Sequence, residues 1–247
     1  MKNLKKLTIL HSNDMHGDFL AEQIDERLVG GGSLLSGYVN KVRREEKNVI
    51  YLMRTKERME KSAARHKIQS NMAKRVLLYG IRKEYSLKEL PAIGKGIYGK
   101  PYFPEYPEIC FNYSHADAGI LCGIAETPLG VDIERLIHPT ERLIRAVCHE
   151  NEKKMLLAIE DPAVQIRYFS KIWTAKESYL KCIGTGIRQK LSNLDLSEVL
   201  DGKTYEEVYH FFFLDGEDFQ AAVCLKTKKM LSNLSVIYME ENENNNL

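Results

Sequence analysis

The sequence has few cysteines and no long apolar run, and both absences narrow the class of protein. Its five cysteines lie far apart without a Cys-x-x-Cys pair, which argues against a disulfide framework. We therefore expect reduced, buried thiols and a cytoplasmic protein. No stretch approaches the roughly 20 apolar residues of a membrane span, so we expect no membrane association. Polar residues interrupt the short apolar run after the basic start, and we expect no signal peptide.

A strong net charge is also missing, because the formal charge is only +2 over 247 residues, of which 44% are hydrophobic. Residues 53–100 nevertheless carry thirteen lysines and arginines against four glutamates. This segment is either a solvated helix face or a surface that attracts an anion. No interleaved aromatics or nucleic-acid reader motif accompanies the charge, so we expect a phosphorylated small molecule and no nucleic acid. The polar tail, 241–247, is expected to be disordered.

Periodicity and turn residues predict a mixture of helices and short strands. The apolar stretches at 111–115 and 118–126 predict two strands joined by a turn. The stretches 141–160 and 162–183 have the composition of two helices. Each half of the chain places a helix before apolar hairpin strands, so the sequence predicts an α+β fold with a weak internal repeat.

Two carboxylates interrupt the apolar strand GVDIE at 130–134. Because side chains alternate along a strand, Asp132 and Glu134 project from one face while Val131 and Ile133 project from the other. Adjacent carboxylates repel unless a cation lies between them, and all-oxygen ligands suit Mg²⁺. The pattern indicates a magnesium site, or else an exposed strand face with solvated acids.

A second motif places a third carboxylate beside a cation. In KIWTAKESYLKCIGTG, at 171–186, helical spacing puts Trp173, Glu177 and Lys181 on one face. One interpretation is a surface ion pair next to a core tryptophan. The other is that Glu177 completes the magnesium site and Lys181 neutralises a leaving phosphate.

Four motifs in order carry a resemblance to a known family. GKP at 99–101, FNYSH at 111–115, GVDIE and WTAKESYLKCIGTGI resemble those of 4'-phosphopantetheinyl transferases of the surfactin-synthetase-activating type. The resemblance covers roughly residues 54–240. It implies a pseudo-twofold pair of similar α/β subdomains, each a small antiparallel sheet packed with helices, divided here as 53–130 and 131–240.

The resemblance also implies an activity and a set of site residues. The family transfers the 4'-phosphopantetheine group of coenzyme A to a serine of an apo acyl or peptidyl carrier protein and releases 3',5'-ADP. Such an enzyme needs Mg²⁺, and we expect a monomer. The implied proton acceptor is Glu177 or a magnesium-bound water near Glu134. The implied residues are the metal ligands Asp132, Glu134 and Glu177, the catalytic pair Glu177 and Lys181, and the coenzyme A contacts Lys100, Ser114, His115 and Lys181; Glu152 matches a recurring glutamate.

The opening residues, 1–52, resemble a different family. HSNDMHG, followed by a glycine-led helix pattern and a second strand, is similar to the start of calcineurin-like metallophosphoesterases of the 5'-nucleotidase type. That resemblance implies that Asp14 and His16 are metal ligands, although the later motifs of the family do not occur. Two alternatives therefore stay open: a metallophosphoesterase or nucleotidase, and a catalytically impaired module that only binds carrier proteins.

Overall fold

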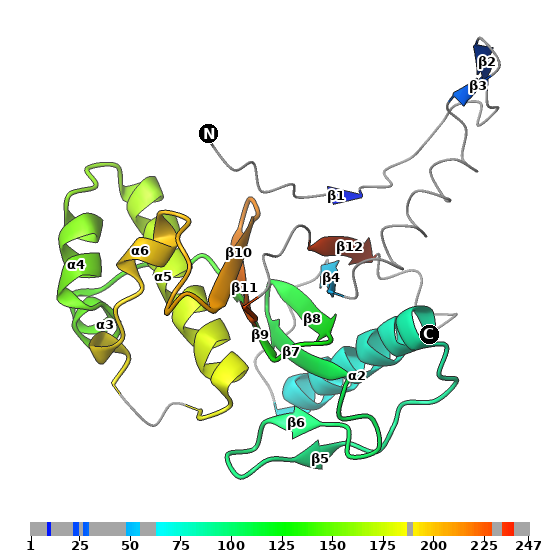
Figure 1. The fold of residues 1–247 in the computed structure, drawn as a ribbon. Coiled ribbons are helices and arrows are strands. Elements are labelled where there is room, and N and C mark those ends of the chain that lie inside the picture. Colours follow the sequence, from blue (N-terminus) through cyan, green and yellow to red (C-terminus); the bar gives the residue numbers. More distant parts are fainter. Residues whose placement is uncertain are drawn as a thin grey trace.

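The chain folds into four layers in a computed structural model: a helix, a five-stranded sheet, a three-stranded sheet and a helical layer (Figure 1). The structure describes residues 9–10, 22–24, 27–29, 48–54, 63–186, 190–228 and 234–239. Asp14, His16 and the tail 241–247 lie outside these residues, so the predictions that concern them remain predictions.

The first large sheet has the strand order β1-β12-β4-β8-β7. Strands β4, β8 and β7 pair antiparallel, whereas β12 pairs parallel with both β4 and β1. Its strands are β1 (Ile9–Leu10), β4 (Val49–Arg54), β7 (Cys110–Ala116), β8 (Gly119–Ala125) and β12 (Ser235–Met239).

The second large sheet is antiparallel with the order β10-β11-β9. Two short hairpins complete the strands. The three-stranded sheet consists of β9 (Leu129–Arg135), β10 (Tyr209–Asp215) and β11 (Phe219–Lys226). The first hairpin pairs β2 (Glu22–Ile24) with β3 (Arg27–Val29), and the second pairs β5 (Gly94–Lys95) with β6 (Pro101–Tyr102).

The helices cover the outer faces of the two sheets (Figure 1). Helix α2 (Ala63–Tyr85) lies against the five-stranded sheet, and α5 (Pro162–Ile183) lies against β9 and β11. The remaining helices are α3 (Glu141–Val147), α4 (Glu150–Leu157), the 3₁₀ turn η1 (Leu191–Asn193) and α6 (Ser197–Leu200). Within the described parts of the chain, no helix is both long and apolar enough to cross a membrane.

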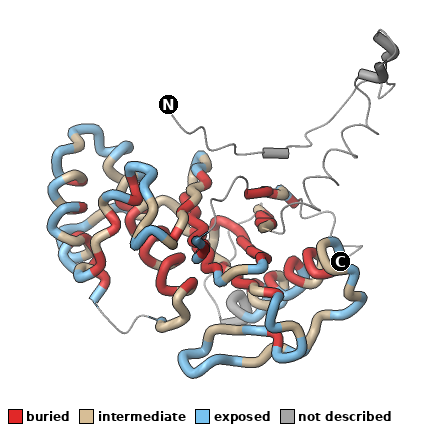
Figure 2. Tube along the Cα trace, in the orientation of Figure 1, coloured by how far each residue is buried: buried red, intermediate tan, exposed pale blue. Residues whose placement is uncertain are grey.

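Three apolar clusters fill the spaces between the layers, and the buried segments in Figure 2 follow them. One lies between α2 and the five-stranded sheet, a second between the two sheets, and a third between the three-stranded sheet and α5. Burial of apolar surface on this scale is the main favourable contribution to folding. Representative members, in the same order, are Tyr51, Leu77 and Ile120; Leu52, Val131 and Val223; and Phe169, Ile172 and Leu180.

Local signals at both ends fix the position of α5. Asp161 caps the helix by accepting hydrogen bonds from Ala163 N and Val164 N, and Pro162 occupies the first turn. Gly184 ends the helix with φ at 73°, a left-handed conformation that glycine adopts most easily. The sequence prediction of a helix over 162–183 is therefore confirmed.

The predicted α+β class is confirmed, with two corrections in detail. The five-stranded sheet is mixed rather than antiparallel, because β12 from the end of the chain inserts parallel to β4. The predicted single helix over 141–160 is two helices, because His149 and Glu152 form a capping box that starts α4. The division of the chain at residue 130 stays a prediction, and β12 crosses it.

Candidate functional site

The candidate site begins on β9, where apolar and acidic side chains alternate. Val131 and Ile133 are buried between the two sheets, which places Asp132 and Glu134 on the opposite face, toward α5. The predicted alternation is therefore confirmed. Helix α5 comes exceptionally close to β9 at Gly130, where a Cβ atom would collide with the backbone oxygen of Ser178 and the backbone nitrogen of Cys182.

Asp132 is the centre of a hydrogen-bonded group that joins β7, β9 and α5. Its Oδ1 atom accepts hydrogen bonds from Lys181 Nζ at 2.6 Å and from Ser114 Oγ at 3.0 Å. Lys181 Nζ also donates to Ser114 Oγ at 3.0 Å. The side chain of Asp132 is only 3% exposed whereas that of Lys181 is 30% exposed, so the ammonium connects a buried carboxylate with solvent.

Two buried carboxylate oxygens at this site lack a hydrogen-bond partner among the described residues. They are Asp132 Oδ2 and Glu177 Oε1. Buried polar atoms are almost always satisfied, and an unpaired carboxylate oxygen is costly. Such atoms suit a cation supplied from solution.

The electrostatics of the site show an excess of acid. Burial, reinforced by the charge of Asp132, raises the pKa of Glu134 to about 7, while Lys181 lowers it and Glu177 raises it. Burial and the charge of Asp132 likewise raise the pKa of Glu177, and Lys181 opposes them. One ammonium therefore does not balance three carboxylates, and a divalent cation would relieve the repulsion.

A pocket of about 190 Å³ opens beside this group. Glu177 and Lys181 line it from α5, and Asn112 lines it from β7. The β5–β6 hairpin contributes Lys100, and the residues after α5 contribute Gly184. The pocket thus touches the GKP, FNYSH and WTAKES motifs, which the sequence separates by up to eighty residues.

Lys100 and His115 are also predicted to contact coenzyme A, and their side chains have different surroundings from that of Ser114. The ammonium of Lys100 donates to Leu129 O at 3.1 Å and to Cys182 O at 2.6 Å, and burial lowers its pKa. His115 follows Ser114 on β7, so alternation directs its side chain to the opposite face of the strand. Whether either side chain contacts coenzyme A remains a prediction.

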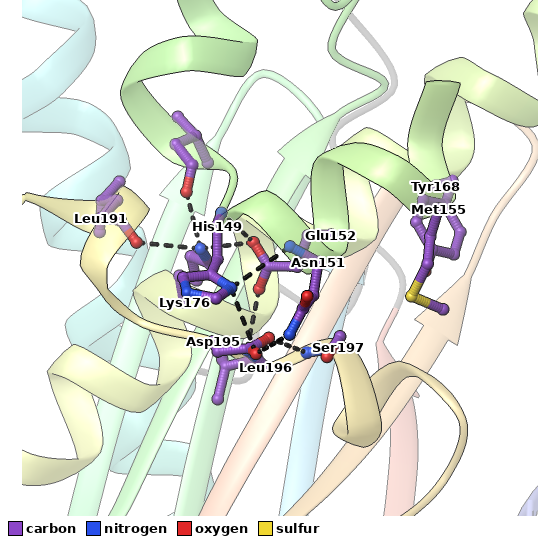
Figure 3. A network of polar contacts seen from close by, with 11 residues as sticks. His149, Asn151, Glu152, Met155, Tyr168, Lys176, Leu191, Asp195, Leu196 and Ser197 are labelled. Atoms are coloured by element: carbon purple, nitrogen blue, oxygen red, sulfur yellow. Dashed lines mark hydrogen bonds and ion pairs between the residues drawn. The ribbon is translucent and has the colours of Figure 1, made fainter. Parts of the chain in front are cut away.

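Glu152 belongs to a separate buried network near the start of α4 (Figure 3). Its carboxylate lies 2.6 Å from Lys176 Nζ, and both side chains are fully buried. Leu196 N and His149 N donate to the same carboxylate, and Lys176 Nζ donates to Val147 O and Leu191 O. Burial raises the pKa of Glu152 and lowers that of Lys176, and their mutual attraction opposes both shifts. This network fixes α4 and the loop after α5 against the residue that precedes Glu177.

Within the parts of the chain that the structure describes, no group of three or more His, Cys, Asp or Glu side chains is arranged as metal ligands. The three-carboxylate magnesium site therefore stays a prediction. The unpaired oxygens of Asp132 and Glu177 nevertheless fit an oxygen-coordinated cation such as Mg²⁺.

Sequence reasoning missed two residues that shape the site. Gly130 allows the close approach of α5, and Asn112 accepts a hydrogen bond from Val131 N at 2.9 Å through Oδ1. Both lie inside the quoted motifs. Their contacts depend on how distant elements meet, which the local pattern does not reveal.

Comparison with known proteins shows which family part of the chain resembles. The model of the family described as the 4'-phosphopantetheinyl transferase superfamily matches residues 128–236, which include β9 and α5. These residues resemble phosphopantetheinyl transferases. The resemblance predicted from the motifs is confirmed over this part of the chain, whereas the phosphoesterase resemblance of residues 1–52 stays a prediction.

Curated relatives carry the same name. The chain is 31% identical over 134 residues to a 4'-phosphopantetheinyl transferase of Bacillus subtilis, covering 51% of this chain and 59% of that protein. It is 40% identical over 93 residues to 4'-phosphopantetheinyl transferase gsp of Aneurinibacillus migulanus, covering 38% of each chain. It is 33% identical over 139 residues to the human L-aminoadipate-semialdehyde dehydrogenase-phosphopantetheinyl transferase, covering 51% of this chain and 44% of that protein.

The similarity is partial in extent. The matches to these relatives cover between 38% and 59% of their length. A solved structure, the holo-[acyl-carrier-protein] synthase of Thermotoga maritima, is 17% identical over 42% of this chain and 64% of that chain, with a TM-score of 0.33. That score is too low to decide the fold, which rests on the elements described above.

Proposed function

We propose that this protein is a magnesium-dependent 4'-phosphopantetheinyl transferase. It would transfer the phosphopantetheine group of coenzyme A to a serine of an apo acyl or peptidyl carrier protein. The single observation that carries the proposal is the convergence of Asp132, Glu177 and Lys181 beside a pocket, in a segment that matches this superfamily. We expect the protein to act as a monomer in the cytoplasm.

The magnesium ion would be held by carboxylate oxygens of Asp132, Glu134 and Glu177. The unpaired oxygens of Asp132 and Glu177, together with the raised pKa values of Glu134 and Glu177, support this assignment. When bound, such an ion withdraws charge from phosphate oxygens and so lowers the barrier to displacement at phosphorus.

The remaining chemistry belongs to the side chains of the protein. The carrier serine oxygen forms a bond to the β-phosphorus of coenzyme A, and the bond from that phosphorus to the bridging oxygen breaks. The 3',5'-ADP leaves with the electron pair, and Lys181 stabilises the negative charge that develops there. The serine proton passes to Glu177 or to a water held near Glu134. Ser114, and by resemblance His115 and Lys100, would contact the phosphates on the ADP side.

Intact-protein mass spectrometry of an apo carrier protein tests the proposal. With coenzyme A and Mg²⁺, the wild-type protein should add about 340 Da to the carrier, the mass of one phosphopantetheine group transferred through phosphoryl chemistry. Glu177→Gln should abolish this addition, because it removes a charged oxygen from the cation site. The matched control is Glu160→Gln, which changes an exposed glutamate away from the pocket.

Each alternative function gives a different result. An unmodified carrier that still binds the protein would indicate a catalytically impaired binding module. Release of phosphate from nucleotides, lost in His16→Ala, would indicate a phosphoesterase. Equal modification rates for wild type and Glu177→Gln would show that the assignment of Glu177 is wrong.

A further inference from the structure

The free edge of β9 lies beside β7, a strand of the other large sheet. Strand β9 is the last strand of the three-stranded sheet, and β7 is the last strand of the five-stranded sheet. An edge strand leaves alternate backbone N–H and C=O groups without a partner in its own sheet. Because β9 carries Asp132 and Glu134, whatever satisfies its free edge also decides where those carboxylates lie.

Two side chains from the first half of the chain bond to backbone groups on this edge. Asn112 Oδ1 accepts a hydrogen bond from Val131 N at 2.9 Å, and Lys100 Nζ donates to Leu129 O at 3.1 Å. The same ammonium donates to Cys182 O, near the end of α5. The first half therefore binds the backbone of both elements that carry the candidate catalytic residues.

We infer that Asn112 is a positioning residue that holds Asp132 against Lys181, an inference that rests on the proposed function. Asn112 and Ser114 lie two residues apart on β7, so they share a face of the strand. Ser114 bonds the Asp132 side chain while Asn112 bonds the backbone of the residue before it. Together they fix the register between two sheets that share no backbone ladder at this boundary.

The N–H of Val131 requires a hydrogen-bond acceptor at position 112. Asn112 is 5% exposed, and its hydrogen bond to Val131 is buried. An apolar side chain of similar shape would leave the N–H of Val131 buried without an acceptor, and water has little access to replace it. The edge of β9 would then move away from β7, and Asp132 would move with it.

Hydrogen exchange of the Val131 amide, followed by NMR in the full-length protein, tests this role. Asn112→Leu should make this amide exchange faster than in the wild type. The control is Phe111→Leu, at the neighbouring position of β7. This substitution weakens the buried stack of Phe111 on Phe103, but the side chain of Phe111 points away from β9. The control should lower thermal stability and leave Val131 protected. Asn112→Ser, whose hydroxyl is too short to reach Val131, carries the test if Asn112→Leu does not fold.

A second readout measures the cation site. The Mg²⁺ concentration that gives half of the maximal thermal stabilisation should rise by about tenfold or more in the Asn112 variants, as for other residues that orient metal ligands. It should stay unchanged in Phe111→Leu. Wild-type protection of Val131 in the Asn112 variants would overturn the inference, and so would a Mg²⁺ dependence equal to that of the control. Loss of protection in the Asn112 variants, together with a wild-type protein that modifies no carrier, would leave the positioning role intact and refute the proposed function.

Discussion

At the scale of single residues, the buried pair of Glu152 and Lys176 stabilises the helix that carries Glu177. Lys176 precedes Glu177 on α5. Besides its ion pair with Glu152, three hydrogen bonds hold the ammonium and the carboxylate in place, two accepted by backbone oxygens and one donated by Leu196 N. The carboxylate also caps α4 through His149 N. A change in this pair therefore reaches the start of α4, the loop after α5 and the orientation of α5 itself.

Removing one partner should be far more damaging than removing both. Lys176→Met leaves the Glu152 charge buried and unpaired, and we expect the free energy of unfolding to fall by about 3–5 kcal/mol. The double variant Lys176→Met/Glu152→Gln should recover part of this loss, because no buried charge remains. Urea unfolding of the wild type, Lys176→Met and the double variant measures both steps. A double variant no more stable than Lys176→Met would contradict the account.

At the scale of elements, Gly130 controls the distance between β9 and α5. We expect Gly130→Ala to cost about 1–3 kcal/mol of stability, the usual range for overpacking, because the new methyl group meets backbone atoms of α5 that have little freedom to move. The displacement would also separate Asp132 from Lys181 and lower the rate of carrier modification.

Gly96→Ala is the matched control for that substitution. A methyl group at position 96 would lie 3.5 Å from Lys100 O, an ordinary contact, and should change neither stability nor rate appreciably. If Gly130→Ala were as stable and as active as Gly96→Ala, the close approach of α5 to β9 would not matter for the site.

The elements near the site were largely predictable from the sequence, and the reasons are local. Strict alternation in VDIE determined which face carries Asp132 and Glu134, and Asp161, Pro162 and Gly184 marked the ends of α5. The break between α3 and α4 was missed, because a capping box that uses a histidine in place of serine or threonine is a weak signal.

At the scale of the whole molecule, the pairing of distant strands was not predictable. The sequence contains no local sign that β12 inserts beside β4, since strand pairing across almost two hundred residues depends on the packed structure. The same limit applies to the site. The sequence brought Glu177 and Lys181 together on a helix, but not Asn112 against Val131, because that contact requires strands of two different sheets to lie side by side.

Asp218 forms ion pairs with two arginines from different sheets, at the C-terminal end of β9. Arg54 from β4 and Arg135 from β9 donate to the two oxygens of Asp218 at 2.6 and 2.8 Å. The hydrogen bond from Arg54 is the largest cause that lowers the pKa of Asp218 below its ordinary 3.8, with the charges of both arginines adding to it and burial opposing it. These side chains are 35–40% exposed, so solvent screens the attraction.

The pH dependence of this cluster follows from the direction of the pKa shift. A lowered pKa in the folded state means that Asp218 stabilises the fold above pH 3.8 and that this contribution disappears as the pH falls through the folded pKa. Asp218→Asn should therefore lower the free energy of unfolding by about 1 kcal/mol at neutral pH, where the exposed pair is screened. The difference should shrink as the pH falls below 3.8 and vanish once the pH lies below the folded pKa, where both side chains are neutral. Urea unfolding at neutral pH and over a series of acidic pH values measures it, and a difference that stays constant across the series would contradict the assignment.

The central claim is that the carboxylates of β9 and α5 hold a divalent cation that binds the diphosphate of coenzyme A. Isothermal titration calorimetry of coenzyme A binding, with Mg²⁺ and with a chelator, tests it most directly on the wild type and on Asp132→Asn. The account predicts that Mg²⁺ strengthens binding to the wild type and has little effect on Asp132→Asn. Equal affinity of the wild type for coenzyme A with and without Mg²⁺ would contradict it.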